Sequence, residues 1–217
     1  MVRLPGKAKE LKSALIQTVF FDIGGVLINI HPERTIQYWA ERAGLDPEVV
    51  QKHFPEDDYY SYERGEINDH EFFSAFINSL PGSVEIHETD FWKGWKLLLG
   101  TENGSTTILK QLAQSYPVWL LSNTNPRHIR DELGRRVSFL DYIAGAVYSF
   151  DVGYRKPDVR IFHYALKKAG VQAQAALFID DIKANVDAAN ELGLQVIHYR
   201  GDQALNTELT ALGLLSE

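Results

Sequence analysis

Residues 18–30 read TVFFDIGGVLINI, and we expect this stretch to decide the fold. Residues 19–21 form a run of β-branched and aromatic side chains without polar alternation, which is typical of a strand buried on both faces. The run ends at the carboxylate of Asp22, and the glycines Gly24 and Gly25 then let the backbone turn sharply and a ligand come close. Because open α/β sheets bind ligands at the carboxyl ends of their strands, Asp22 marks a candidate site. Taken alone, Asp22 also fits a surface residue at a strand-to-turn junction.

The size and composition of the chain limit the kinds of function it can have. Its 217 residues are enough for one good core, or for a core with a small accessory unit. The net charge of −7 argues against a nucleic-acid partner, which would favour a basic face. The chain has no cysteine, which excludes disulfides and thiolate metal sites, and its many carboxylates favour hard cations.

Neither a membrane span nor a signal peptide is expected. No stretch approaches the roughly 20 apolar residues that cross a bilayer. Residues 1–17 are mildly basic but lack the apolar segment of a signal peptide, so we interpret them as an N-terminal extension before the first strand. The expected compartment is the cytoplasm, and the expected state is a monomer or a homodimer.

Residues 31–100 have a helical pattern and show no convincing strand. The pattern predicts helices over residues 32–43, after Asp46, after Asn68 or Asp69, and over residues 89–99. We therefore predict a helical cap domain over residues 31–100, inserted after the first strand.

From residue 101 onward, strands alternate with helices of ten to fifteen residues. The predicted strands are 118–121, a segment near 143–148, 176–179 and 195–198, and the predicted helices are 105–115, a short one from Pro126, 158–169 and 183–192. This alternation is typical of an α/β fold with a Rossmann-like, doubly wound parallel sheet. We predict one core domain made of residues 18–30 and 101–217.

Polar residues follow the predicted strands, where a parallel sheet gathers them along one edge. Besides Asp22, these residues are Ser122, Asn123, Lys156, Asp180 and Asp181. Three carboxylates close together raise each other's pKa, and a Mg²⁺ ion resolves that conflict. Hydroxyl, amide and ammonium groups are what an anion needs. The set as a whole indicates phosphoryl transfer through an aspartyl-phosphate.

Each of these residues also has a simpler interpretation. Ser122 and Asn123 could cap the next helix, and Lys156 alone is most often a solvated lysine. The acidic pair Asp180 and Asp181 could cap the helix that follows it. Their joint occurrence at strand ends and helix starts favours one shared site.

These motifs closely resemble those of the haloacid dehalogenase superfamily of hydrolases. The matching stretches are VFFDIGGVL, VWLLSN, GYRKPD and FIDDIKANVDAAN, and they run from residue 18 to about residue 200. The stretches ERGEIND, LSNTNPRH and VGYRKPDVRIF are most similar to the α-D-glucose-1-phosphate phosphatase subgroup and, more distantly, to the phosphatase domain of soluble epoxide hydrolase. The resemblance implies a Rossmann-like core with a helical cap after the first strand.

The resemblance also implies a role for each matching position. The implied Mg²⁺ ligands are Asp22, the backbone carbonyl of Gly24, Asp181, and Asp180 directly or through water. Asp22 would also be the nucleophile. Ser122 and Asn123 would bind phosphoryl oxygens, and Lys156 would offset negative charge on the nucleophile and the transferred group. Asn185 would orient the acidic loop.

One position departs from the pattern of most phosphatases in this superfamily. They carry a second Asp two residues after the nucleophile as general acid and base, whereas this chain has Gly24. A missing acid or base typically costs about 10²–10⁴-fold in rate, so a slow or selective enzyme is expected. The glucose-1-phosphate phosphatase subgroup shares the glycine. His31 is a candidate substitute, with a surface or capping histidine as the alternative.

The leading hypothesis is a Mg²⁺-dependent phosphatase of a small phosphorylated metabolite, such as a sugar phosphate. Its cap would close over the site, and Arg64, Glu66 and Trp95 are candidates for reaching it, or else parts of the cap's own packing and surface. One alternative is a metal-free 2-haloacid dehalogenase-type hydrolase, although its paired carboxylates would then lack a neutralising cation. The other is a non-catalytic protein of the same fold that binds a phosphorylated ligand.

Overall fold

A five-stranded parallel sheet forms the centre of the computed structural model, which describes residues 16–134 and 137–215. Its strands are β1 (Thr18–Phe21), β4 (Val118–Ser122), β5 (Gly145–Tyr148), β6 (Ala176–Asp180) and β7 (Gln195–His198), in the order β5-β4-β1-β6-β7. The central strand β1 pairs in parallel with β4 and with β6, with Val19 opposite Val118 and Leu177. The predicted α/β fold with a parallel sheet is confirmed.

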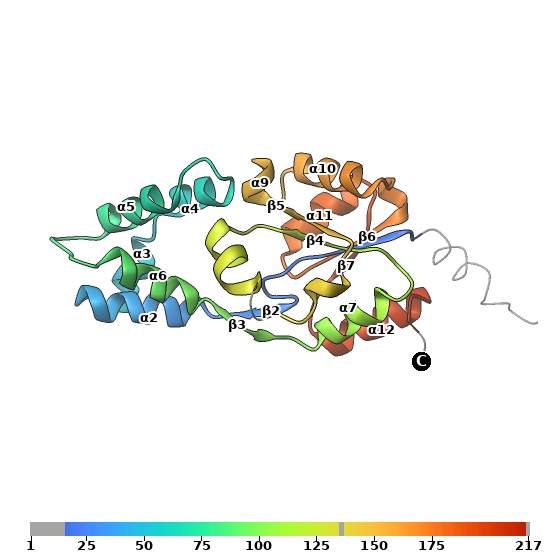
Figure 1. The fold of residues 1–217 in the computed structure, drawn as a ribbon, viewed down its shortest axis with the longest axis horizontal. Helices are drawn as coiled ribbons and strands as arrows, with labels where there is room; N and C mark the ends of the chain where they lie inside the picture. Colours follow the sequence, from blue (N-terminus) through green and yellow to red (C-terminus); the bar gives the residue numbers. More distant parts are fainter. Residues whose placement is uncertain (1–15, 135–136, 216–217) are drawn as a thin grey trace, which may run out of the picture.

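Helices cover both faces of this sheet. Val19 and Phe21 pack in one apolar cluster and Phe20 in another, because successive side chains of a strand point to opposite faces. Helices α7 (Ser105–Leu112) and α12 (Asp202–Leu212) contribute to the first cluster, and α10 (Val159–Ala169) and α11 (Lys183–Glu191) to the second. Figure 1 shows these two helical layers on either side of the strands. Burial on both faces explains why β1 contains no polar alternation.

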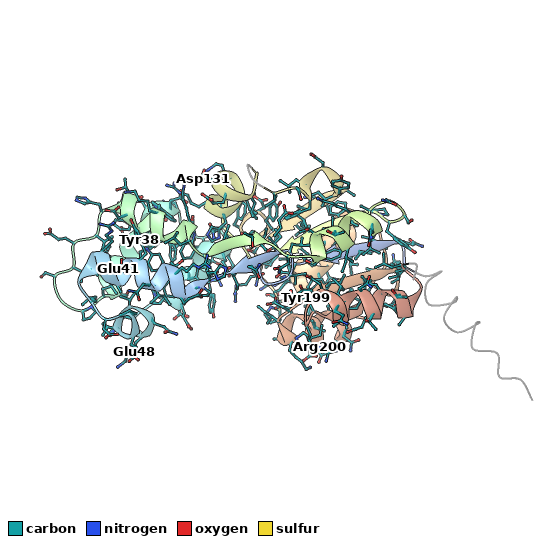
Figure 2. The ribbon with its side chains drawn as sticks, turned by 90° about the horizontal axis from the view of Figure 1, so that it is seen from below. Tyr38, Glu41, Glu48, Asp131, Tyr199 and Arg200 are labelled. Atoms are coloured by element: carbon teal, nitrogen blue, oxygen red, sulfur yellow. The ribbon has the colours of Figure 1, made fainter. Side chains whose placement is uncertain are left out.

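The helical insertion lies at one end of the molecule (Figure 1). Its helices are α2 (Pro32–Ala43), α3 (Pro47–Lys52), α4 (Glu56–Glu63), α5 (Asp69–Ser79) and α6 (Glu88–Lys96). They enclose a separate aromatic core in which Trp39 stacks on Phe91 at 4.8 Å between ring centroids. This cluster agrees with the predicted helical cap. In Figure 2, the labelled Tyr38, Glu41 and Glu48 lie on this helical part, and Tyr199 and Arg200 lie on the sheet part.

A short antiparallel ribbon connects the insertion to the sheet. It consists of β2 (Ile28–Ile30) and β3 (Leu99–Glu102), with Ile30 opposite Leu99. The prediction that residues 31–100 contain no strand is therefore wrong at their end, and the helix predicted to reach residue 99 stops at Lys96. The reason is non-local, since the entering and leaving segments of the insertion pair with each other.

The remaining elements adjust several predicted boundaries. The helix predicted over residues 105–115 ends at Leu112. The short helix predicted from Pro126 does begin there, and most of it is a π-helix, η1 (His128–Leu133). Short helices α9 (Ser149–Val152), η2 (Leu140–Tyr142) and η3 (Ala173–Ala175) were not predicted, nor was α12.

Most of the predicted N-terminal extension, residues 1–15, lies outside the described residues. Ile16, just before β1, is buried in the first apolar cluster. Within residues 16–134 and 137–215, no helix combines the length and the apolar character needed to cross a membrane.

Candidate active site

Asp22 stands directly after the central strand, at the carboxyl edge of the sheet. Its backbone N–H donates to Ile179 O at 2.9 Å, which ties it to β6. Its side chain is only 6% exposed and accepts a hydrogen bond from Lys156 Nζ at 2.7 Å. Asp22 is therefore a buried carboxylate with a cationic partner, and the alternative of a surface residue at a turn is excluded.

Lys156 brings a cation to this carboxylate from the segment between α9 and α10. Its ammonium group donates to Asp22 Oδ1 at 2.7 Å, Asp180 Oδ2 at 2.6 Å and Leu121 O at 2.8 Å. The side chain is 1% exposed, so the interpretation of Lys156 as a solvated lysine is wrong. Burial alone would lower the pKa of the ammonium group, but the carboxylates of Asp22 and Asp180 raise it above its ordinary value.

Asn123 fixes the position of Lys156. Its side-chain Oδ1 accepts from Lys156 N at 2.7 Å, and its Nδ2 donates to Lys156 O at 2.9 Å. The amide expected to bind phosphoryl oxygens is thus used to hold the backbone of the lysine. Ser122, the last residue of β4, is 2% exposed, and its hydroxyl makes a long 3.4 Å contact with Asn123 O.

Asp180 is the last residue of β6 and is completely buried. Besides Lys156, it accepts hydrogen bonds from Ile182 N at 2.7 Å and from Asn185 Nδ2 at 3.1 Å. Asn185 therefore does make the contact with the acidic segment that was expected of it. These donors orient the Asp180 carboxylate toward the lysine.

Asp181 differs from Asp180 because one of its oxygens lacks a donor. Its Oδ1 is buried and has no hydrogen-bond partner among the described residues. Its carboxylate packs against Gly25, where φ is +80° and an added Cβ would collide with it. A buried carboxylate oxygen without a donor is costly unless a ligand satisfies it.

The three carboxylates form one cluster. Asp22, Asp180 and Asp181 each offer an oxygen atom within 4.8 Å of the others. Burial raises the pKa of Asp22 to about 7, with Asp180 and Asp181 acting in the same direction and Lys156 opposing them. Burial, with help from Asp180, also raises the pKa of Asp181. Carboxylates that resist ionisation for these reasons, with one unsatisfied oxygen, fit a small divalent cation such as Mg²⁺.

A cavity of about 300 Å³ opens onto this cluster. Of the residues predicted from the sequence, it is lined by Asp22, Gly24, Ser122, Asn123, Lys156 and Asn185. Asp180 and Asp181 do not belong to the lining and join the site through the carboxylate cluster. The structure thus brings together residues from four distant segments of the chain.

The side chains that reach the cavity from the insertion differ from those expected. Tyr59, Tyr60 and Glu63 line it, whereas Arg64 and Glu66 pair with each other at 2.7 Å near the surface. Glu63 stands one position before Arg64 in the same ERGE stretch, so the motif was informative but the face of the helix was not predictable.

Trp95 and His31, two further candidates from the sequence, do not line the cavity. Trp95 does not line the cavity; its ring stacks on His128 at 5.1 Å between centroids, and His128 and Asn125 line the cavity instead. His31 is not part of the lining, and its Nδ1 lies 3.0 Å from Glu33 Oε1.

Arg155, next to Lys156, lines the cavity but was not predicted from the sequence. Its only signal was its place in GYRKPD.

Comparison with known proteins shows which family this chain is similar to. A family model described as a haloacid dehalogenase-like hydrolase matches residues 16–193. A GMP/IMP nucleotidase of Escherichia coli is 33% identical over 201 residues, which cover 83% of this chain and 81% of that protein. A D-ribitol-5-phosphate phosphatase of Bacteroides thetaiotaomicron is 25% identical over 205 residues, covering 91% and 98% of the two chains.

A solved structure resembles the fold over most of its length. It is a haloacid dehalogenase family enzyme of Bacteroides thetaiotaomicron in complex with magnesium and inorganic phosphate. The TM-score is 0.76 at 25% identity, and the match covers 86% of this chain and 95% of that one.

Proposed function

The chain belongs to the haloacid dehalogenase-like hydrolase family, and from this premise we propose that it is a Mg²⁺-dependent phosphatase of small phosphorylated metabolites. Asp22 is the proposed nucleophile, and an aspartyl-phosphate is the proposed intermediate. The observation that carries the proposal is the cluster of Asp22, Asp180 and Asp181, in which the ammonium group of Lys156 contacts the first two carboxylates.

In the first step, an oxygen of Asp22 attacks the phosphorus of the substrate. The new bond joins this oxygen to phosphorus, and the ester bond breaks with its electron pair going to the departing alcohol oxygen. Because Gly24 brings no acidic side chain, that oxygen takes its proton from water. In the second step, water hydrolyses the aspartyl-phosphate, which releases inorganic phosphate and restores the Asp22 carboxylate.

Mg²⁺ would be held by Asp22, Asp181, the backbone carbonyl of Gly24 and Asp180, and when bound it would neutralise charge on the carboxylates and the phosphoryl group. Lys156 lowers the cost of ionising Asp22 and attracts the phosphoryl oxygens. Asn123 keeps Lys156 in place through two hydrogen bonds, and Asn185 does the same for Asp180. The Ser122 hydroxyl is the proposed donor to a phosphoryl oxygen.

The relatives support the substrate class. Those named above act on a phosphorylated polyol and on nucleotides, which are all phosphomonoesters of small molecules. Within this class, hexose 1-phosphates are the finer candidates that the resemblance to α-D-glucose-1-phosphate phosphatases implied. The cytoplasmic location and the monomeric or homodimeric state stay predictions.

The metal-free dehalogenase alternative is less well supported by the geometry. Without a cation, the unsatisfied Oδ1 of Asp181 would stay buried beside two further carboxylates. The residues present therefore favour the metal-dependent reaction.

The test is hydrolysis of p-nitrophenyl phosphate by the wild-type protein with Mg²⁺, with EDTA, and in an Asp22→Asn variant. We expect EDTA to abolish turnover and Asp22→Asn to lower kcat/KM by about 10³-fold or more. Asp187→Asn is the matched control, since this carboxylate is exposed and pairs with Lys183 on the surface. Equal rates in the wild type and the Asp22→Asn variant would remove Asp22 from the mechanism. Phosphate binding without turnover would favour the non-catalytic alternative.

A further inference from the structure

A second polar cluster lines the same cavity, and no catalytic step uses it. Glu63 belongs to α4 of the insertion, and Arg155 belongs to the sheet domain. Arg155 Nε and Nη2 each lie 3.0 Å from Glu63 Oε2, and the Tyr59 hydroxyl donates to Glu63 Oε1 at 2.7 Å. The guanidinium also lies over the ring of Tyr60, 4.0 Å from its centroid. The cluster therefore joins both parts of the molecule at the wall of the cavity.

As a contact that only holds the two parts together, this ion pair is unfavourable because burying its charges costs hydration free energy. The Glu63 side chain is 3% exposed and that of Arg155 is 25% exposed, so both charges lose much of their hydration. Well-packed apolar side chains often stabilise such a position equally well or better. Burial raises the pKa of Glu63 even with Arg155 and Tyr59 opposing it, which reflects the same cost.

The contact between the two parts has other support. An added Cβ on Gly65, just after α4, would collide with the backbone of Phe150 in α9, so the two helices approach closely there. Arg127 of the sheet domain pairs with Asp69 of the insertion at 2.7 Å. Trp95 stacks on His128 across the same boundary. The ion pair of Glu63 and Arg155 is therefore not the only contact that holds the two parts together.

We propose that Glu63 and Arg155 bind hydroxyl groups of the leaving alcohol, so that the preferred substrates are phosphomonoesters of polyols and sugars. This inference rests on the proposed phosphatase function and narrows its substrate class. A hydroxyl group both donates and accepts, whereas a carboxylate only accepts and a guanidinium only donates. A hydroxyl beside this ion pair can accept from the guanidinium and donate to the carboxylate in charge-assisted hydrogen bonds. Both residues line the same cavity as Asp22 and Lys156, so the leaving group of a phosphate bound there shares this cavity with them.

The structure also contains a second cavity that would favour an apolar leaving group. An apolar cavity of about 290 Å³ lies in the insertion and shares Ile30, Tyr59 and Leu98 with the lining of the first cavity. An alkyl or terpenoid leaving group would occupy it. The two substrate classes therefore compete for the same phosphate site, and the polar pair favours the hydroxylated one.

The experiment compares polyol phosphates with n-alkyl phosphates of the same chain length. The polyol series is glycerol 3-phosphate, erythritol 4-phosphate, ribitol 5-phosphate and sorbitol 6-phosphate, and phosphate release is measured with Mg²⁺. Because hydrogen bonds to charged groups are strong, we expect the best polyol phosphate to exceed its alkyl partner by about 10-fold or more in kcat/KM. We expect Glu63→Gln and Arg155→Lys each to lower this ratio by about 10-fold.

Matched controls come from the same neighbourhood. Glu66→Gln makes the same change three residues away, in the surface pair with Arg64, and Arg160→Lys does so in the surface pair with Asp158. Both should leave the ratio unchanged. The ratio does not depend on the fraction of folded protein. If a single variant unfolds, the double variant Glu63→Gln with Arg155→Gln removes both charges together, and the same ratio of kcat/KM values is measured on it.

The outcomes separate this inference from the proposed function. A loss of polyol selectivity in the Glu63 and Arg155 variants, with selectivity unchanged in the two controls, supports it. An equal fall for every substrate would give Glu63 and Arg155 a structural role only and overturn it. Faster turnover of alkyl phosphates by the wild type would place the leaving group in the apolar cavity and overturn it as well. Absence of Mg²⁺-dependent hydrolysis of p-nitrophenyl phosphate would instead contradict the phosphatase function itself.

Discussion

Gly24 and Gly25 are neighbours in the turn after Asp22 but differ in their tolerance of a side chain. Gly25 has φ +80°, and an added Cβ there would collide with the Asp181 carboxylate. Gly24 does not have a positive φ, and an added Cβ would meet only Ile30 Cγ2, at 3.4 Å. The backbone therefore requires glycine at position 25 and allows other residues at position 24.

A Gly24→Asp substitution should consequently restore an acid and base. We expect it to raise kcat for alkyl and polyol phosphates by about 10²-fold, the lower end of the usual effect of general acid catalysis. Turnover of p-nitrophenyl phosphate should change little, because its leaving group needs no proton. Phosphate-release assays of both substrate types measure the difference.

Gly24→Ala is the control for this change, since it adds the Cβ without the acid. It should resemble the wild type on both substrates. A similar gain in Gly24→Ala, or a loss of activity in Gly24→Asp, would contradict the assignment of position 24 as a vacant acid position.

The pKa of Asp22 gives Mg²⁺ binding a defined pH dependence. Burial raises this pKa from 3.8 to about 7, so in the metal-free protein a proton occupies the carboxylate below about pH 7. Mg²⁺ must displace that proton. We expect the Kd for Mg²⁺ to rise about tenfold for each pH unit below 7 and to level off above it. Isothermal titration calorimetry at pH 5.5 and 8 measures it, and equal Kd values at these two pH values would contradict the prediction.

The helices and strands show how far the sequence determines the fold. The helix over residues 32–43 and the strand over residues 195–198 have the predicted bounds, because apolar periodicity and helix caps are local signals. The ribbon of β2 and β3 was missed because its strands are short and pair over about 70 residues. The lack of local signal explains this error.

The same difference applies to the site. Asp22, Ser122 and the acidic pair were predictable because the carboxyl ends of parallel strands meet at one edge. Glu63 was not, since Glu63 and Arg64 are neighbours on a helix and only the docking of the insertion decides which one faces the cavity. Arg155 was hidden for the same reason, as its partner lies in the other part of the molecule.

Helix α5 depends on its N-terminal cap, and this dependence is measurable. Asn68 accepts hydrogen bonds from His70 N and Glu71 N, and Glu71 Oε2 accepts from Asn68 N at 2.7 Å. Asn68→Ala should lower the free energy of unfolding by about 1 kcal/mol. Urea denaturation measures the change. Asn78→Ala, at an exposed position on the same helix, should change it by less than about 0.5 kcal/mol, and an equal loss in both variants would contradict the capping role.

The two parts of the molecule meet at the cavity, so the site is complete only when they are in contact. The insertion contributes Tyr59 and Glu63, and the sheet domain contributes Asp22 and Lys156. The ribbon of β2 and β3 joins the two parts (Figure 1). The three carboxylates all belong to the sheet part of the molecule, so metal binding should stabilise the protein without a ligand from the insertion.

Mg²⁺ should therefore stabilise the protein against heat, and Asp181 should control the effect. A ligand at 100 times its Kd adds about 2.7 kcal/mol to the free energy of unfolding, or about 5–10 °C in Tm for a chain of this size.

The pKa of Asp181 is raised in the folded protein, mainly by burial. The ionised Asp181 carboxylate therefore lowers the stability of the metal-free protein near neutral pH, because the stability contributed by a raised carboxyl pKa is lost as the pH rises through it. Asp181→Asn should thus raise the Tm of the metal-free protein and abolish its response to Mg²⁺. Thermal unfolding at pH 7.5 with EDTA or Mg²⁺ measures both effects, with Asp187→Asn as the control. A full Mg²⁺ response in Asp181→Asn would show that the cation binds elsewhere.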